Sequence, residues 1–298
     1  MNFFILHHNT KTMDSFTAKK PLYINLKGTL TDVSEPLVMG ILNVTPDSFF
    51  AGSRYQTEQE IVARARKIIE EGGRIIDLGA YSSRPDAVDI TEAEEMERLE
   101  FALRILNREF PDAILSVDTF RSGIARRCVE EFGVAIINDI SGGQIDPEMF
   151  TTVASLQVPY ILMHMVGTPQ TMMQHTRYDN FLQDIFLYFA KRVNELRLLG
   201  VNDIILDPGF GFSKTLEDNY RLMNHLADFR IFELPLLSGI SRKSMIYKLL
   251  DTTPAESLNG TTVLNTLSLM GGANILRVHD VKEATEAVTI FKMTQSQQ

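Results

Sequence analysis

The chain has 298 residues, of which 44% are hydrophobic and 22% charged, a composition typical of a soluble globular protein. Its net charge of −9 argues against a nucleic-acid-binding surface, and its single cysteine, Cys128, excludes an internal disulfide framework. No apolar segment approaches the length of a membrane span, and the short apolar segment at residues 3–6 lacks the features of a signal peptide. We therefore predict a cytoplasmic protein.

The N-terminal part of the chain contains two different segments. Residues 1–20 are mixed in character, and we expect a flexible tail there, followed by one domain over residues 21–298. We interpret His7 and His8 as part of this tail and not as a metal site. Residues 23–33 alternate apolar and polar side chains around Lys27 and Gly28. This pattern predicts a β-hairpin that closes the bottom of a barrel.

From residue 37 onward, short apolar segments alternate with longer amphipathic segments. The apolar segments predict strands at 37–43, 74–78, 114–117, 134–138, 160–163, 203–206, 236–239 and 274–278. The amphipathic segments predict helices at 57–71, 91–108, 122–132, 147–156, 180–199, 216–227, 255–270 and 282–293, with a short additional helix at 243–250. Eight strand–helix units without a dividing linker favour an α/β protein with a TIM-type (β/α)8 barrel over a doubly wound sheet.

Polar residues stand at or directly after the ends of many of these strands, and the set is Asn43, Asp77, Asp118, Asn138, Asp207 and Arg277. In a (β/α)8 barrel the carboxyl ends of all strands meet at one mouth, so the pattern predicts a functional site there. Two members also have structural interpretations. Asn138 could be a turn residue, and Asp118 could help to start the helix at Ser122.

The segments around these strand ends resemble, in order, the loops of dihydropteroate synthases. They are GILNVTPDSF at 40–49, DLGAYSSRP at 77–85, SVDT at 116–119, NDISGG at 138–143, MHM at 163–165, GTPQ at 167–170, DPGFGF at 207–212, SRKSM at 241–245 and RVH at 277–279. The resemblance extends from about residue 24 to the C-terminus. It implies a transferase of folate synthesis that joins p-aminobenzoate to 6-hydroxymethyl-7,8-dihydropterin diphosphate and releases pyrophosphate.

The same resemblance implies further properties. It implies a Mg²⁺ cofactor, small-molecule substrates and a family that sulfonamides target. It also implies a homodimer, for which the helix at 255–270 offers the apolar residues Val263, Leu264, Leu267 and Met270. The implied mechanism is a largely dissociative substitution through a pterin cation, with the pterin diphosphate bound before the arylamine.

The chemistry of the pterin explains several of the polar residues. An ionised carboxylate accepts two hydrogen bonds side by side, so Asp207 suits the amino group and the adjacent ring N–H. Asn138 offers both a donor and an acceptor, Lys243 a donor for the pterin carbonyl, and Asp118 a negative charge for a pterin cation. The predicted pterin-binding residues are Asp118, Asn138, Met163, Asp207, Phe212 and Lys243.

The leaving pyrophosphate needs positive charge. Arg277 and His279 alternate along the last strand and so face the same way, in the part of a barrel where phosphate groups often bind. The predicted diphosphate-binding residues are Asn43, Arg84, Arg277 and His279, with Asn43 as the Mg²⁺ ligand. The predicted p-aminobenzoate-binding residues are Phe49, Ser83, Arg84, Pro85, Phe212, Lys243 and Ser244. The predicted catalytic residues are Asp118, Asp207, Lys243, Arg277 and His279.

Arg242 and Lys243 are also expected in the first turn of a helix, where cations oppose the helix dipole, and this placement suggests a ligand in front of them.

The chain departs from the family in its first two loops, with Phe50-Ala51 and Ala80-Tyr81 at positions where other residues are more usual. Two alternatives stay open, and the altered loops support only the second. One is a related pterin-barrel methyltransferase that passes a methyl group to a corrinoid, and the other is a pterin-binding barrel without catalysis.

Overall fold

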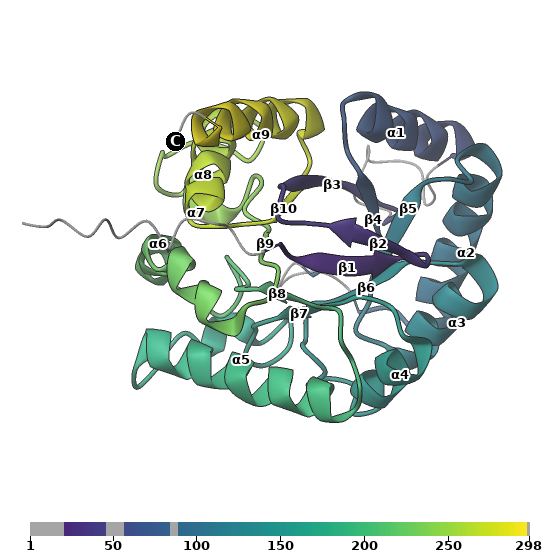
Figure 1. Cartoon of the computed structure of the whole chain (residues 1–298), viewed down its shortest axis with the longest axis horizontal. Helices are drawn as coiled ribbons and strands as arrows, with labels where there is room; N and C mark the ends of the chain where they lie inside the picture. Colours follow the sequence, from purple (N-terminus) through teal and green to yellow (C-terminus); the bar gives the residue numbers. More distant parts are fainter. Residues whose placement is uncertain (1–20, 46–56, 84–88, 297–298) are drawn as a thin grey trace, which may run out of the picture.

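An eight-stranded parallel barrel surrounded by helices forms the body of the protein (Figure 1). The computed structural model describes residues 21–45, 57–83 and 89–296, so the predicted tail at 1–20 lies outside it. The barrel strands are β3 (Leu37–Asn43), β4 (Ile75–Gly79), β5 (Ile114–Asp118), β6 (Ile136–Asp139), β7 (Tyr160–Met163), β8 (Ile204–Asp207), β9 (Leu237–Ser238) and β10 (Ile275–Val278). They pair in the order β8-β7-β6-β5-β4-β3-β10-β9. A parallel bridge between Leu206 and Leu236 joins the two outer strands and nearly closes the barrel, which confirms the predicted fold class.

The predicted hairpin is confirmed and lies across one end of the barrel (Figure 1). Its strands are β1 (Tyr23–Leu26) and β2 (Thr29–Asp32), which pair antiparallel through a turn at Lys27 and Gly28. Both turn residues have positive φ, 50° and 82°, as a two-residue hairpin turn of this kind requires. Ile24 and Leu26 are buried against the lower ends of the barrel strands, so the hairpin seals the N-terminal end of the barrel.

The helices follow the strands as the periodicity predicts. They are α1 (Glu58–Glu70), α2 (Glu92–Glu109), α3 (Ser122–Phe132), α4 (Met149–Leu156), α5 (Phe181–Leu198), α6 (Leu216–Asn224), α7 (Ser244–Tyr247), α8 (Leu258–Met270) and α9 (Val281–Gln295), with 3₁₀ turns η1 (Met172–Gln174) and η2 (Leu226–Phe232). Thr91 and Glu94 form a capping box at the start of α2. Helix α8 begins three residues later than predicted because Glu256 accepts hydrogen bonds from the hydroxyls of Thr252 and Thr253, which hold the preceding segment in a separate turn.

Alternation along the strands decides what each residue contacts. In β4 and β10, Ile75 and Ile275 belong to the apolar cluster at the bottom of the barrel, together with residues of the hairpin. Their neighbours Ile76 and Leu276 belong instead to the large cluster between strands and helices. Because side chains of a strand alternate between faces, Asp77 and Arg277 return to the interior one step further up, at the mouth. Cys128 is fully buried in the outer cluster.

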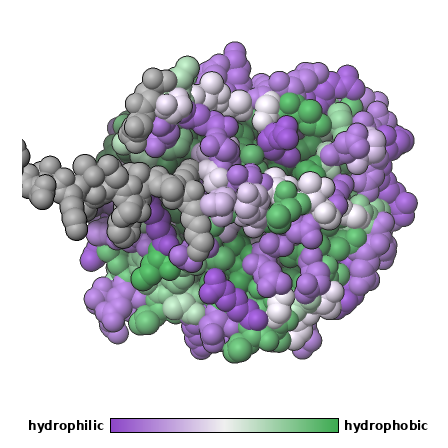
Figure 2. Space-filling model, viewed as in Figure 1, coloured by the Kyte–Doolittle hydropathy of each residue, from purple (hydrophilic) through white to green (hydrophobic). Residues whose placement is uncertain are grey.

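The outer surface carries no obvious division into a polar and an apolar half on the side that Figure 2 shows, where hydrophilic and hydrophobic residues are interspersed. Among the described residues, no helix is both long and apolar enough to cross a membrane.

Candidate active site

Arg277 lies between two carboxylates at the mouth of the barrel. Its Nε donates to Asp77 Oδ2 at 2.6 Å, and its Nη2 donates to Asp118 Oδ2 at 2.7 Å. Burial by itself would lower the pKa of Arg277, but the charges of Asp77 and Asp118 outweigh it and raise the pKa above the ordinary value. The guanidinium is therefore permanently charged, and it joins strands β4, β5 and β10 across the mouth.

The carboxylate of Asp118 pairs with Arg277 and does not cap the helix that follows. The N–H of Ser122 donates to Asp146 Oδ2 at 2.7 Å, so a different carboxylate caps α3 and the structural interpretation of Asp118 is wrong. Burial raises the pKa of Asp118 to about 7; Arg277 opposes this shift, whereas the charge of Asp77 adds to it. Asp118 thus combines a half-buried carboxylate with an ion pair to Arg277.

Asp77 connects two of the predicted residues, although the sequence interpretation assigned it no role. It is fully buried, and its Oδ2 accepts from Asn138 Nδ2 at 3.1 Å as well as from Arg277. Its Oδ1 is buried without a hydrogen-bond partner among the described residues. Asn138 is likewise buried and directed at this carboxylate, so it is not a simple turn residue. The position of Asp77 at the end of a predicted strand was the feature of the sequence that could have assigned it to the site.

Asp207 and Lys243 form the other side of the mouth. Asp207 is buried at the end of β8, and its Oδ1 accepts the N–H of Gly209 at 2.8 Å. Burial raises the pKa of Asp207, and the charge of Lys243 counteracts the shift. Lys243 donates from Nζ to the carbonyl of Phe210 at 2.5 Å and lies 4.4 Å from the centre of the Phe212 ring. Burial lowers the pKa of Lys243 to about 8, although Asp207 opposes this.

A second lysine, Lys214, supports the turn after Asp207 from below. Its side chain is buried, and its Nζ donates to the carbonyls of Gly209 and Phe212 at 2.9 Å each and contacts His164 Nδ1 at 3.1 Å. Burial lowers the pKa of Lys214 to about 7, against the opposing charge of Asp207. Lys214 was not among the predicted site residues, because nothing in the sequence indicates that a lysine in a glycine-rich turn points inward.

His279 is held as a neutral imidazole. Its Nδ1 lies 3.1 Å from Ser241 Oγ, which also accepts the backbone N–H of His279 at 3.1 Å. Burial lowers the pKa of His279 to about 4, and the nearby charge of Arg277 lowers it further. His279 can therefore offer a hydrogen bond to an anion at neutral pH but not a positive charge. Ser241 is a further residue that the sequence interpretation left without a role.

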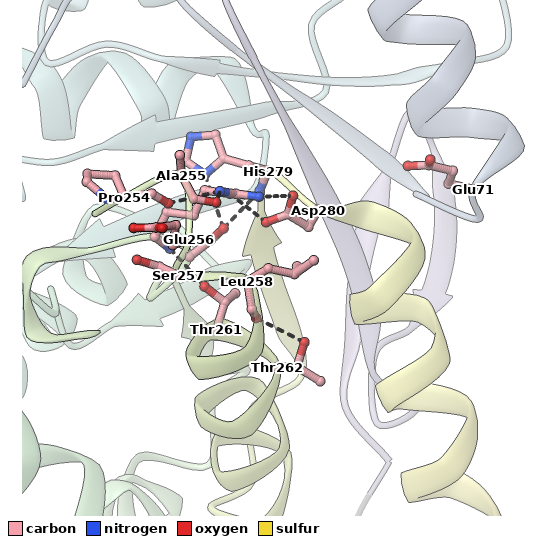
Figure 3. A network of polar contacts seen from close by, with 12 residues as sticks. Glu71, Pro254, Ala255, Glu256, Ser257, Leu258, Thr261, Thr262, His279 and Asp280 are labelled. Atoms are coloured by element: carbon pink, nitrogen blue, oxygen red, sulfur yellow. Dashed lines mark hydrogen bonds and ion pairs between the residues drawn. The ribbon is translucent and has the colours of Figure 1, made fainter. Parts of the chain in front are cut away.

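Arg242 has a structural function, which agrees with its exclusion from the predicted catalytic residues. Its guanidinium forms a bidentate pair with Asp280 at 2.8 Å and donates to the carbonyls of Pro254 and Ala255. Figure 3 shows Asp280 and His279 beside the segment from Pro254 to Leu258. The expectation of two cations in a first helical turn is wrong, because α7 begins at Ser244 and Lys243 is its N-cap. The dipole argument therefore applies only to Lys243.

Asn43 ends β3 beside Gly79 of β4. A Cβ atom on Gly79 would lie 3.0 Å from Asn43 Oδ1 and 3.7 Å from the Cβ of Asp118, so the glycine leaves room for the Asn43 amide between the two strands. Within the described residues no cluster of three or more His, Cys, Asp or Glu side chains could hold a metal ion. Asn43 nonetheless fits a Mg²⁺ ion whose other ligands come from water and a substrate phosphate, because Mg²⁺ prefers oxygen ligands of this kind.

An apolar wall completes the mouth, and its buried members are Phe120, Ile140, Met163, Met165, Met172 and Phe212, with Tyr81 and Ile145 packed against them. Two predicted residues, Met163 and Phe212, belong to it. Ser83, in the loop after β4, and Ser244, the first residue of α7, are both half-buried. Phe49, Arg84 and Pro85 lie outside the described residues.

Comparison with known proteins shows which family the chain resembles. A model of the pterin binding enzymes matches residues 39–279. A dihydropteroate synthase from Escherichia coli is 40% identical over 272 residues, which cover 91% of this chain and 95% of the relative. One from Haemophilus influenzae is 36% identical over 275 residues, covering 92% of this chain and 98% of the relative.

Solved structures agree. A Yersinia pestis dihydropteroate synthase in complex with a sulfonamide drug has a TM-score of 0.86 at 39% identity and covers 92% of this chain and 100% of its own. A Xanthomonas albilineans dihydropteroate synthase with 4-aminobenzoic acid has a TM-score of 0.84 at 32% identity and covers 93% and 99%. The chain therefore belongs to the pterin-binding barrel enzymes, and within that class its family is the dihydropteroate synthases, which are transferases of folate synthesis.

Proposed function

We propose that the protein condenses 6-hydroxymethyl-7,8-dihydropterin diphosphate with p-aminobenzoate to form 7,8-dihydropteroate and pyrophosphate. The observation that carries this proposal is the convergence of Asp207 and Lys243 with the Arg277–Asp118 pair at one barrel mouth. A carboxylate, an amine and an amide around an apolar wall match the donors, acceptors and flat faces of a pterin. Family membership supports the same assignment.

Each buried polar residue then has a role. Asp207 accepts from the pterin amino group and ring N–H, and Lys243 donates to the pterin carbonyl. Asn138 binds the same ring edge, with Met163 and Phe212 packed against the ring faces. The unpaired oxygen of Asp77 is a further acceptor for a ligand N–H, since a buried carboxylate oxygen without a donor is unfavourable.

The diphosphate occupies the region of Asn43, Arg277 and His279. Mg²⁺, held by Asn43 and the diphosphate, would neutralise the charge that develops on the leaving group. His279 donates a hydrogen bond there as a neutral imidazole, and Arg277 supplies the fixed positive charge. Arg84, predicted to bind the same group, is assigned by resemblance alone.

The reaction is a dissociative substitution. The bond between the pterin methylene carbon and the diphosphate oxygen breaks first, and its electron pair leaves with pyrophosphate. The cationic pterin that remains is stabilised by the carboxylates of Asp118 and Asp207. The p-aminobenzoate nitrogen then attacks the methylene carbon and loses a proton. We assign p-aminobenzoate to Phe49, Ser83, Arg84, Pro85, Phe212, Lys243 and Ser244, and no protein nucleophile is required.

We further propose a homodimer and a cytoplasmic location. The exposed apolar residues Val263, Leu267 and Met270 on α8, together with Ile290 and Met293 on α9, support a surface that a second copy could cover. Sedimentation of the purified protein tests this, since a monomer at all concentrations would contradict it. Fractionation of cells that express the protein tests its location.

One assay tests the proposed activity. The protein is mixed with the pterin diphosphate, p-aminobenzoate and Mg²⁺, and dihydropteroate and pyrophosphate are measured. Equal amounts of both products are expected, and activity should be lost with a chelator and recovered with added Mg²⁺. Binding of the pterin without product would instead indicate a barrel without catalysis. Methyl transfer from a methylated folate to a corrinoid would favour the methyltransferase.

A further inference from the structure

Arg121 contacts both ends of the loop between β4 and α2. Near the start of the loop, its guanidinium carbon lies 5.6 Å from the centre of the Tyr81 ring, over its face. Near the end, its Nη2 donates to the carbonyl of Ile90 at 2.6 Å and lies 3.8 Å from Asp89 Oδ1. One side chain from the start of α3 thus joins two loop segments that are eight or nine residues apart in sequence.

The position of Arg121 is itself fixed by buried charge. Its Nη1 donates to Glu95 Oε2, and the Glu95 side chain has no exposed surface. Glu95 Oε1 accepts from the hydroxyl of Thr119 at 2.7 Å, and the Thr119 hydroxyl accepts the backbone N–H of Arg121 at 3.2 Å. Thr119 directly follows Asp118. Arg121, which contacts the loop, and Asp118, the predicted catalytic carboxylate, therefore lie on the same short segment.

A purely structural helix start would not favour this arrangement. Arg121 is the N-cap of α3 and makes no side-chain cap, and a cation at that end opposes the helix dipole. Burial of Glu95 is a second unfavourable contribution, and it raises the pKa of Glu95 while Thr119 and Arg121 act in the opposite direction. Neither placement caps α3, and beyond its ion pair with Glu95 the Arg121 guanidinium contacts Tyr81, Asp89 and Ile90 of the loop between β4 and α2.

Tyr81 extends the contact to another loop. Its ring packs edge-on against Phe120, with centroids 5.0 Å apart, and its hydroxyl accepts from Gln170 Nε2 at 2.7 Å. Phe120 belongs to the apolar wall that also contains Met163 and Phe212. The residues that Arg121 holds are thus continuous with the predicted pterin pocket.

We propose that Arg121 is a positioning residue that holds Tyr81 and Ile90, and thereby Ser83 between them, at the mouth of the barrel. The consequence for p-aminobenzoate rests on the proposed function, in which Ser83 contacts that substrate. Arg121 itself touches no substrate. Its loss should therefore weaken the use of p-aminobenzoate while the deep residues Asp207 and Lys243 continue to bind the pterin.

Arg121→Met is the principal test, with Arg126→Met as the matched control, because Arg126 lies on the same helix and pairs with Glu130 at the surface. Misplacement of a substrate-contacting group by a fraction of an ångström supports an expected rise of about tenfold in KM for p-aminobenzoate. The affinity for the pterin diphosphate should change by less than about twofold. Arg121→Lys keeps the charge but loses the planar contact with Tyr81 and should fall between the two.

Hydrogen exchange provides a readout that does not depend on activity. Exchange of amides at 81–83 and 89–91 should be faster in Arg121→Met and unchanged in Arg126→Met, because the loop ends lose their shared contact. If the wild type makes no dihydropteroate but this exchange responds, the proposed function fails and the role of Arg121 stands. Unchanged exchange, or an equal loss of affinity for both substrates, would contradict the positioning role.

Two further variants test the proposal if Arg121→Met does not fold. Glu95→Gln with Arg121→Met removes both members of the buried ion pair, so no isolated charge remains. Tyr81→Leu leaves the ion pair intact and removes only the ring and the Gln170 bond, so it should reproduce part of the effect. If neither variant alters loop exchange or the KM for p-aminobenzoate, the proposal is wrong.

Discussion

The two ends of the barrel are made from the same strands but contain opposite chemistry. At the bottom, the interior positions of β3, β4, β6, β8 and β10 are Met39, Ile75, Ile136, Ile205 and Ile275, packed against the hairpin. Two residues further along four of these strands, the interior positions hold Asp77, Asn138, Asp207 and Arg277. The bottom excludes water by apolar contact. The mouth instead buries charge, which is unfavourable unless each group finds a partner.

This difference shows which end carries function. Burying apolar side chains stabilises a fold directly, so the bottom needs no further explanation. Grouping the buried Asp77 and Asp207 with the half-buried Asp118 around one arginine and one lysine is unfavourable for the carboxylates, and Asp77 Oδ1 has no hydrogen-bond partner among the described residues. Apolar side chains at the mouth would stabilise the fold at least as well as these charged groups do. The charged mouth is therefore maintained for a ligand.

The largest effect on stability is expected at the bottom. Ile24→Ala removes a side chain that is 1% exposed in the hairpin and leaves a cavity against the barrel, which should cost about 2–5 kcal/mol of the free energy of unfolding. Leu30→Ala, on the exposed strand of the same hairpin, is the matched control. Denaturant unfolding measures both variants. The folded fraction of Ile24→Ala should keep its kcat, and a large fall in kcat would show that the two ends are not separate in function.

The next effect is expected at the mouth. Arg277→Ala should weaken binding of the pterin diphosphate by roughly ten- to a hundredfold, since a charge-assisted contact contributes about 1.5–3 kcal/mol. Binding of a pterin without phosphate should weaken much less. Calorimetry with both ligands measures the difference, with Arg104→Ala on the surface of α2 as a control. Equal losses for both ligands would mean that Arg277 serves mainly to separate Asp77 from Asp118.

Asp207→Asn tests recognition by a nearly isosteric change. An amide accepts one hydrogen bond but presents N–H to the second pterin donor, and an unpaired buried donor costs about 1–3 kcal/mol. The affinity for a pterin without phosphate should fall accordingly. Thermal stability is measured beside it. A folded variant that binds pterin as well as the wild type would remove Asp207 from the site.

The sequence predicted the fold and much of the mouth for a physical reason. Short continuous apolar segments mark buried strands, and a period of about 3.6 residues marks the buried face of each helix, so the eight units and the strand-end residues could be identified. Partners across the barrel could not. The contact between Arg277 and Asp77 joins residues two hundred positions apart, and the inward direction of Lys214 depends on a turn whose geometry follows from tertiary contacts. The pairing of Arg242 with Asp280 was missed for the same reason.

The smallest expected effect is a dependence on pH that affects the mouth alone. The proposed mechanism needs an ionised Asp118 and a protonated Lys243. The Asp118 pKa is raised to about 7, so its negative charge is lost as the pH falls below that value. The Lys243 pKa is lowered to about 8, so its positive charge is lost as the pH rises above it. The value of kcat/KM should therefore pass through a maximum between these limits, changing by at most about tenfold for each further pH unit.

Two variants assign the limbs of this profile. Asp118→Asn cannot ionise, so its low but measurable kcat/KM should lose the acidic limb. Lys243→Arg carries a guanidinium that stays protonated, so its profile should lose the alkaline limb even if its maximum is lower. His279 should not contribute, because burial places its pKa near 4 and it is neutral throughout this range. Lys214 titrates in the same range, because burial lowers its pKa to about 7, so a limb that persists in both variants would be assigned to Lys214. An acidic limb that persists in Asp118→Asn would assign that proton to another group, such as the substrate, and would contradict the need for an ionised Asp118.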